Sequence, residues 1–387
     1  MPPTSSRSPS RRRSFSIEWT RSLDRPDPPI SAVILAGGVG SRFWPASTPS
    51  RPKQLLPLAS ENPLIVDTVT RALRLVPETR LHILTGEHLR EPFQRVLPAL
   101  PASAYWIEPR ARGTGPVLAW AAHRLVREDP DAVMVSLHAD HAIVPTDAMV
   151  QLLTTAGAFA ASEGLLLTIA IPPTRPETGY GWIRPGAPLV DRPGFRVWRV
   201  GAFVEKPDLE TARRYLSEGH LWNSGIFVWS AATFLEEVRR LSPEIGPHLP
   251  LLEGGDEAAF FDAVDRISID EAVLERSDRI GTVEATFQWD DVGSWSSLER
   301  SHAPDAQGNA SRGPVHALDA RRNLVWSDEG PVVLWGVDDL VVIRSGDLTV
   351  VAPRDRSPEW KHLLDSLPPE LREKADPRSD DPPEDTP

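Results

Sequence analysis

Three glycines, Gly37, Gly38 and Gly40, fall within four positions directly after an apolar run over residues 31–36. The run is short and β-branched in its middle, which predicts a buried strand. Glycines at such a point let the backbone turn tightly or approach another group closely. Successive exposed N–H groups in the loop bind anions, and the N-terminus of a following helix adds to the attraction. The pattern predicts an anion site at the carboxyl end of the first strand.

Two cations follow the glycines, Arg42 after one intervening residue and Lys53 behind Pro52. Their charges favour a polyphosphate as the anion. The P-loop motif does not fit, because it needs a lysine directly after a glycine. The dinucleotide-binding motif fails as well, because Phe43 stands where its third glycine belongs. The alternative without a ligand is a tight strand-to-helix turn that carries surface cations.

The elements that must position this loop alternate between strand-like and helical runs. Strands are expected at residues 31–36, 81–85, 132–137, 165–170 and 226–229, with helices at stretches such as 62–75, 115–128 and 147–161. This alternation favours an α/β fold with a doubly wound, mostly parallel sheet. Ligands of such sheets bind outside the carboxyl ends of the strands. That rule selects the glycine loop and residues 138–141, which follow the third strand.

Composition divides the chain into four parts. Residues 1–29 are rich in Ser, Arg and Pro and are expected to be a disordered basic tail. The α/β domain with the glycine loop is expected over 30–300. Short strand-like runs predict a small all-β segment with a short C-terminal helix over 309–367, for packing or assembly. Residues 368–387 are rich in Pro, Asp and Glu and are expected to be a disordered acidic tail.

The overall composition is that of a globular protein, with 387 residues, 40% hydrophobic and 25% charged. A net charge of −12 argues against bulk binding of nucleic acid. The absence of cysteine excludes disulfides and thiolate metal sites. No apolar run reaches the ~18 residues of a membrane span, and the basic start lacks the apolar stretch of a signal peptide. We therefore expect a cytoplasmic protein that does not enter a membrane.

Other short stretches also carry residue types suited to chemistry, namely Asp140 and residues 108–116, 177–181, 203–207, 222–227 and 289–295. Each has a structural alternative: Asp140 can cap a helix, Lys206 can lie in a surface turn, and the tryptophans of 289–295 can belong to the core. His138 and His141 flank Asp140 and raise the alternative of a zinc site. The lack of a third obvious ligand disfavours that alternative.

Taken together, these stretches resemble the mannose-1-phosphate guanylyltransferases, also called GDP-mannose pyrophosphorylases. The resemblance covers roughly residues 30 to 360 and rests on LAGGVGSRFWP, PKQLLPL, EPRARGTGP, ADH, RPETGYGWI, FVEKPD, WNSGIFVW and WDDVGSW. The glycine, arginine and Pro-Lys signature indicates a sugar-nucleotide pyrophosphorylase. Residues 43–45, 222–225 and 289–295 narrow it to the mannose enzymes. The resemblance implies a Rossmann-like nucleotidyltransferase fold.

The family transfers GMP from GTP to mannose 1-phosphate and releases pyrophosphate, with Mg²⁺ as cofactor. The resemblance assigns a role to each group of residues found above. The nucleotide would contact Leu35, Ala36, Gly37, Gly38, Gly40, Ser41, Glu108 and Thr114. The catalytic cations would be Arg42, Lys53 and Lys206, with Lys206 against the sugar phosphate. The sugar would contact Gly181, Glu205 and Asn223, and the metal would be held by Asp140 and Asp291.

The implied mechanism is an in-line attack of a sugar-phosphate oxygen on the α-phosphorus of GTP. Two anions must meet, so positioning and charge neutralisation are the main requirements, and no protein nucleophile is needed. Of the adjacent Asp290 and Asp291, only one should reach the metal, because neighbouring residues of a strand point to opposite faces. Asp291 is the one that matches the family.

The sequence departs from the family pattern at three positions. Gly113 stands where asparagine is usual, His138 replaces a proline, and Asp290 replaces a small polar residue. Many bacterial relatives continue into a cupin domain with phosphomannose isomerase activity, for which this chain ends too early. We therefore expect transferase activity alone.

Two alternatives remain open at this point. One is a pyrophosphorylase for another sugar or base. The other is a non-catalytic regulatory subunit that binds the sugar nucleotide, which the presence of all the phosphate-handling and metal-type residues disfavours. A homodimer is compatible with the family, and the small β segment is the part that would serve it.

Overall fold

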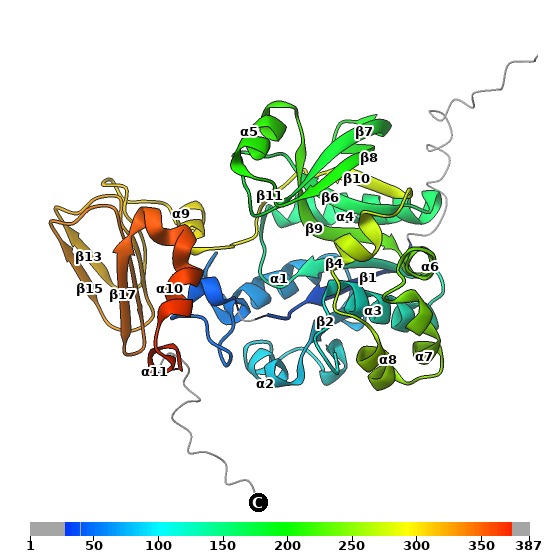
Figure 1. The fold of residues 1–387 in the computed structure, drawn as a ribbon, viewed down its shortest axis with the longest axis horizontal. Helices are drawn as coiled ribbons and strands as arrows, with labels where there is room; N and C mark the ends of the chain where they lie inside the picture. The colour runs from blue at the N-terminus through cyan, green and yellow to red at the C-terminus, as the bar shows by residue number, and fades with distance from the viewer. Residues whose placement is uncertain (1–27, 39, 374–387) are drawn as a thin grey trace, which may run out of the picture.

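The computed structural model describes residues 28–38 and 40–373, so most of both predicted tails lies outside it. Over this range a nine-stranded sheet forms the catalytic domain, in the order β3-β2-β1-β4-β9-β6-β10-β8-β7 (Figure 1). Its strands are β1 (Ile30–Leu35), β2 (Leu81–Thr85), β3 (Tyr105–Ile107), β4 (Val133–His138), β6 (Leu166–Ile171), β7 (Gly181–Arg192), β8 (Phe195–Glu205), β9 (Leu221–Ser230) and β10 (Ile280–Glu284). None of the described helices is long and apolar enough to cross a bilayer.

The first half of the sheet is parallel, as predicted. Strand β1 pairs in parallel with β2 and with β4, and in the second pairing Leu35 lies opposite His138. The glycine loop and residues 138–141 therefore leave the sheet side by side at the carboxyl ends of their strands. The predicted convergence of these two loops is confirmed.

The second half of the sheet departs from a purely parallel arrangement. Strand β9 runs antiparallel to both β4 and β6, and β8 runs antiparallel to β7 and β10. The strand expected at 226–229 is part of the ten-residue β9, and the stretch 203–207 begins in the last residues of the eleven-residue β8. The predicted sugar residues lie at or near the ends of these strands, Gly181 at the start of β7, Glu205 at the end of β8 and Asn223 near the start of β9.

Helices cover both faces of the sheet, and the alternation of β1 side chains shows why. Ala32 and Ile34 enter one core, whereas Val33 and Leu35 enter the other. The first core is closed by α1 (Leu64–Ala72), α2 (Glu87–Val96) and α4 (Thr146–Glu163). The second is closed by α3 (Thr114–Glu128), α6 (Ala231–Leu241), α7 (Leu249–Glu253) and α8 (Glu257–Ala263).

Further elements complete the catalytic domain. The β7–β8 hairpin at one edge of the nine-stranded sheet and α5 (Leu209–Ser217) form a lobe at the top of Figure 1. A two-stranded sheet pairs β5 (Ala142–Val144) with β11 (Gln288–Asp290). This pairing carries residues 290–291 back to the loop that holds Asp140.

The C-terminal part is all-β, as predicted, and its strands coil around an axis. A four-stranded sheet contains β12 (Ala310–Arg312), β14 (Leu324–Ser327), β16 (Leu340–Ser345) and β17 (Leu348–Pro353), and a second sheet pairs β13 (Val315–Leu318) with β15 (Val332–Trp335). Stacked asparagines mark successive turns of the coil. The side chain of Asn309 accepts from the Asn323 amide at 3.0 Å, and the side chain of Asn323 accepts from the backbone N–H of Leu340 at 3.0 Å.

One hydrophobic core joins this β domain to the catalytic loops. Phe43 lies edge-on to Trp295 at 5.1 Å, and Trp295 contacts Trp326 and Trp360 at 5.6 and 6.5 Å between ring centroids. Trp360 opens α10 (Trp360–Ser366) and donates a hydrogen bond to the backbone carbonyl of Trp44 at 2.6 Å. The short helices α9 (Leu298–Ser301) and α11 (Pro369–Glu373) flank this contact, and α11 falls where the acidic tail was expected to begin.

The buried Trp360 should therefore support the whole molecule. Trp360 is 2% exposed, so Trp360→Ala should remove about 3–5 kcal/mol from the free energy of unfolding measured by urea titration. Trp335→Ala is the matched control, because Trp335 is 78% exposed and its loss should change little. Equal effects of the two substitutions would contradict the shared core.

Candidate active site

Side chains of the following segment hold the glycine loop by its carbonyl groups. Gln54 donates to the carbonyls of Gly37 and Gly38 at 3.1 and 3.2 Å, and Ser47 donates to that of Gly40 at 2.7 Å. Gly40 has a left-handed backbone with φ of 73°, and a Cβ there would lie 2.4 Å from the Cβ of Lys53. Glycine is thus required at position 40 for two reasons, backbone conformation and contact with Lys53.

The residues predicted to contact the nucleotide around this loop differ in solvent exposure. Leu35 and Ala36 are buried at the end of β1, so their backbone alone is available to a ligand. Gly37, Gly38, Ser41 and Arg42 are exposed. The positive charge of Arg42 favours the ionised form of the Asp291 carboxylate.

Lys53 joins three distant parts of the chain. Its ammonium donates to Oδ2 of Asp140 at 2.8 Å and to the backbone carbonyl of Asp291 at 2.8 Å, while the residue is 6% exposed. The predicted contact between Lys53 and phosphate stays a prediction. What the geometry adds is that Lys53 sits between the two residues predicted to bind metal.

The electrostatics of Asp140 follow from this arrangement. Burial opposes its charged form, but the hydrogen-bonded ammonium of Lys53 stabilises the carboxylate, and the pKa of Asp140 lies well below its ordinary value. Burial also lowers the pKa of His138 and His141, so both imidazoles are neutral at neutral pH. The site therefore holds one firmly ionised carboxylate beside two neutral rings.

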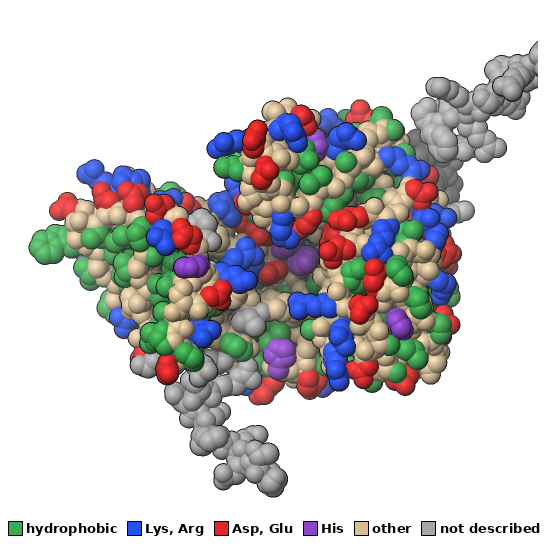
Figure 2. All heavy atoms as spheres, in the orientation of Figure 1, with side chains coloured by type: hydrophobic (Ala, Val, Ile, Leu, Met, Phe, Trp, Pro, Cys, Tyr) green, Lys and Arg blue, Asp and Glu red, His purple; other side chains and the backbone are tan. Residues whose placement is uncertain are grey.

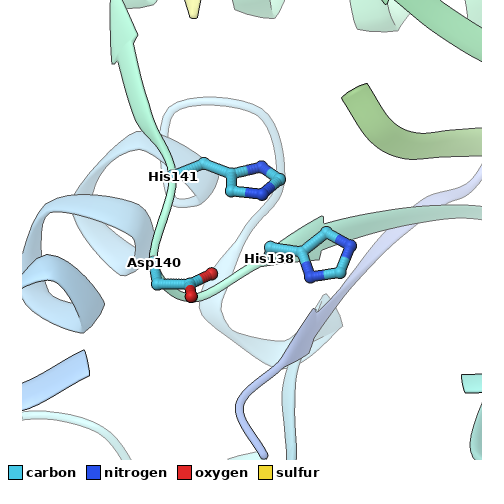
Figure 3. Close-up of side chains that lie close together, drawn as sticks. All are labelled: His138, Asp140 and His141. Carbon is cyan, nitrogen blue, oxygen red and sulfur yellow. The ribbon is translucent and has the colours of Figure 1, made fainter. Parts of the chain in front are cut away.

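Figure 3 shows the side chain of His138, at the end of β4, close to those of Asp140 and His141 in the loop that follows. One possible ligand atom from each lies within 4.8 Å of the others. Asp140 can therefore be the third ligand beside the two histidines, which the sequence analysis did not identify. The rings already have protein partners, however. Nε1 of Trp289 donates to Nδ1 of His141 at 3.0 Å, and His138 is hydrogen-bonded to the backbone of Gly225.

The adjacent Asp290 and Asp291 have different partners. Asp290 forms a two-pronged ion pair with Arg300, whereas Oδ1 of Asp291 accepts a 2.5 Å hydrogen bond from the Tyr180 hydroxyl. Burial raises the pKa of Asp291. Tyr180 in turn accepts from Arg175 at 3.1 Å. Neither Tyr180 nor Arg175 was predicted, although both belong to the motif RPETGYGWI, because only the fold brings them to Asp291.

The predicted sugar residues come together at the base of the β7–β8 lobe. A Cβ at Gly181 would lie 2.6 Å from Oε2 of Glu205 and 3.4 Å from the Cβ of Asn223, so all three share one small space. Lys206 has a left-handed backbone with φ of 47° and pairs with Oε1 of Glu205. Asp270, which the sequence did not single out, also lies here and accepts a hydrogen bond from Asn223.

The predicted base-facing residues lie on the other side of the glycine loop. Glu108 is next to Gly37, where a Cβ would lie 3.8 Å from its Oε1, and burial raises the pKa of Glu108 to about 7. The hydroxyl of Thr114 accepts from the backbone N–H of Ile269 at 2.9 Å. Gly113 has φ of 87°, and a Cβ there would lie 2.5 Å from the Ile267 carbonyl, which explains glycine in place of asparagine.

Comparison with known proteins places this geometry in a family. A nucleotidyl transferase model matches residues 31–308, and a model described as a MannoseP isomerase/GMP-like beta-helix domain matches residues 313–367. The mannose-1-phosphate guanylyltransferase of Escherichia coli (strain K12) is 35% identical over 351 residues, which cover 87% of this chain and 73% of that protein. The alginate biosynthesis protein AlgA of Pseudomonas aeruginosa is 39% identical over 347 residues, with 87% and 71% coverage.

This chain belongs to the mannose-1-phosphate guanylyltransferase family. A crystal structure from Thermus thermophilus, described as a mannose-1-phosphate geranyltransferase, superposes with a TM-score of 0.80 at 33% identity. The alignment covers 87% of this chain and 98% of that one. The family resemblance of the sequence and the nucleotidyltransferase fold with a C-terminal β domain are thereby confirmed, and the chain is a sugar-1-phosphate nucleotidyltransferase.

Hydrogen bonds connect several residues of this guanylyltransferase-family site. Lys53 joins Asp140 and Asp291, Asp291 accepts from Tyr180, and Tyr180 precedes Gly181 in the sugar group. Figure 2 shows charged and histidine side chains gathered in the hollow between the β7–β8 lobe and the rest of the domain. The carboxylates of Asp140 and Asp291 are the oxygen ligands that Mg²⁺ takes in proteins, so this donor set fits the ion.

Asp290 and Asp291 should differ in their effect on the metal. Asp291→Asn should weaken Mg²⁺ binding in the presence of GTP at least about tenfold, because a charged ligand is lost. Asp290→Asn should leave it nearly unchanged, because Asp290 is engaged by Arg300. Calorimetric titration of both variants with Mg²⁺ measures the difference. A stronger effect of Asp290→Asn would reverse the assignment.

Proposed function

We propose that the protein transfers GMP from GTP to α-D-mannose 1-phosphate and releases GDP-mannose and pyrophosphate. The observation that carries the proposal is the series of contacts that joins Lys53, Asp140, Asp291 and Tyr180 to the sugar group of Gly181, Glu205 and Asn223. A nucleoside triphosphate at the glycine loop and a sugar phosphate at the sugar group would meet at the two aspartates. The names of the relatives support guanosine and mannose as the partners.

The reaction needs one bond to form and one to break. A phosphate oxygen of mannose 1-phosphate attacks the α-phosphorus of GTP, and the bond from that phosphorus to the β-phosphate bridging oxygen breaks. Pyrophosphate leaves with the electron pair of that bond. The attacking oxygen is already anionic, so no proton has to be removed and no general base is required.

The protein's own task is to bring two anions together. The exposed Arg42 follows the glycine loop and is placed to neutralise charge that develops on the leaving pyrophosphate. Lys206 lies at the rim of the sugar group, where it would hold the phosphate of mannose 1-phosphate, and its present partner Glu205 would bind a sugar hydroxyl. Glu108 and Thr114 would face the guanine.

The proposed cofactor is Mg²⁺, held by Asp140 and Asp291. When bound, this ion would neutralise phosphate charge beside the reacting phosphorus. The strongly lowered pKa of Asp140 keeps that ligand ionised through the neutral range.

The test is release of pyrophosphate from GTP by the purified protein. Release should depend on mannose 1-phosphate and should be greatest for this pair among four nucleoside triphosphates combined with mannose, glucose and fucose 1-phosphates. Arg42→Ala should lower the rate at least about tenfold, because transition-state charge is then left uncompensated. Arg74→Ala is a matched control on the surface, where Arg74 pairs with Asp147. Preference for another pair would overturn the proposed specificity.

A further inference from the structure

A carboxylate that no motif assigns lies against the sugar group. Asp270 begins a short π-helical turn, Asp270–Leu274, and is partly buried. Its Oδ1 accepts a hydrogen bond from Nδ2 of Asn223 at 3.1 Å.

The orientation of Asn223 leaves half of this carboxylate available. The amide oxygen of Asn223 accepts from the Thr168 hydroxyl at 2.7 Å and from the Gly225 backbone N–H at 3.3 Å. With its oxygen held on that side, Asn223 must turn its NH₂ group toward Asp270. No other side chain of the described residues donates to Asp270, and besides Asn223 the carboxylate accepts from its own backbone N–H, so it keeps room to accept a hydrogen bond from a ligand.

The carboxylate is kept there at a cost in stability. Burial, followed by the neighbouring charge of Glu205, raises the pKa of Asp270 to about 6. Glu275 adds to the rise, and Lys206 opposes it. An acid whose charge is disfavoured in the folded state and that has a single side-chain partner is typical of a functional position.

The backbone before Asp270 is fixed to the predicted base-facing loop. The N–H of Ile269 donates to the Thr114 hydroxyl at 2.9 Å, and the N–H of Ile267 donates to the carbonyl of Arg112 at 3.1 Å. Asp270 therefore occupies a defined place between the nucleotide half and the sugar half of the site.

We propose that Asp270 is a further sugar-binding residue, whose Oδ2 accepts a hydrogen bond from a ring hydroxyl of the sugar phosphate beside Glu205. This inference rests on the proposed function. A hydroxyl fits better than phosphate, because a carboxylate repels an anion. It also fits better than a metal ion, because Asp270 does not belong to the one group of at least three possible metal ligands found among the described residues, which is His138, Asp140 and His141.

The test separates hydroxyl binding from mere support of Asn223. Asp270→Asn keeps an oxygen that can accept from Asn223 but replaces the free acceptor by a donor. KM for mannose 1-phosphate should rise about 10- to 100-fold, the effect of losing a charge-assisted hydrogen bond, while KM for GTP stays constant. Glu275→Gln is the matched control, because Glu275 is an exposed acid that follows the same turn.

Deoxy analogues of mannose 1-phosphate, each lacking one hydroxyl, identify the partner. For the analogue that lacks the hydroxyl bound by Asp270, Asp270→Asn and the wild type should have nearly the same KM, because neither can form that hydrogen bond. A ratio of variant to wild-type KM near one for mannose 1-phosphate itself, or an equal ratio for every analogue, would overturn the assignment of Asp270. Asp270→Ser, which keeps a small acceptor, should show the same dependence on one hydroxyl and serves if the asparagine variant folds poorly.

A second readout does not depend on activity. The pKa of Asp270 in the folded protein lies above the ordinary 3.8, so its contribution to stability is present at low pH and is lost as pH rises through about 6. Asp270→Asn should therefore raise Tm at about pH 7.5 and raise it less near pH 4. An unchanged or lowered Tm at both pH values would contradict a buried carboxylate whose charge is disfavoured in the folded protein. The wild-type rate with mannose 1-phosphate tests the proposed function separately, so the two inferences can fail independently.

Discussion

A single buried ammonium group, that of Lys53, determines how the active-site loops are arranged. It joins a loop after β1, a loop after β4 and the segment after β11 through two hydrogen bonds of 2.8 Å. A buried charge of this kind is tolerated only when it is paired, and loss of one partner commonly costs about 3–5 kcal/mol. The contact with Gly40 places the glycine loop directly against the same side chain. The phosphate loop and the two aspartates are thus positioned by one residue.

The C-terminal β domain packs against the chain segments that carry the active-site loops. Phe43 follows Arg42 and packs on Trp295, which belongs to the same segment as Asp291 and lies in one core with Trp326 and Trp360. The predicted role of this domain in packing therefore has a specific meaning. Its apolar residues pack against the two chain segments that carry Arg42 and Asp291 and so contribute to the position of both residues.

The sequence predicted what depends on local pattern. The apolar runs located β1, β2, β4 and β6, and the rule about carboxyl ends of parallel strands located the glycine loop beside His138. The direction of β9 and the length of β8 were missed, because a buried strand has the same pattern in either orientation. The hydrogen bonds from Lys53 to Asp140 and from Tyr180 to Asp291 were missed because they join residues 87 and 111 positions apart. Asp270 carried no signal, since an acid in a polar stretch is ordinary until the fold places it beside Asn223.

The most direct test of the account is a double-mutant cycle on Lys53 and Asp140, measured as the free energy of unfolding in urea at neutral pH. The account predicts that Lys53→Met destabilises the protein by about 3–5 kcal/mol, because the partly buried Asp140 carboxylate loses its cation. Lys53→Met combined with Asp140→Asn should then be much less destabilised than the sum of the single substitutions. Strictly additive effects would contradict the claim that this ion pair organises the site.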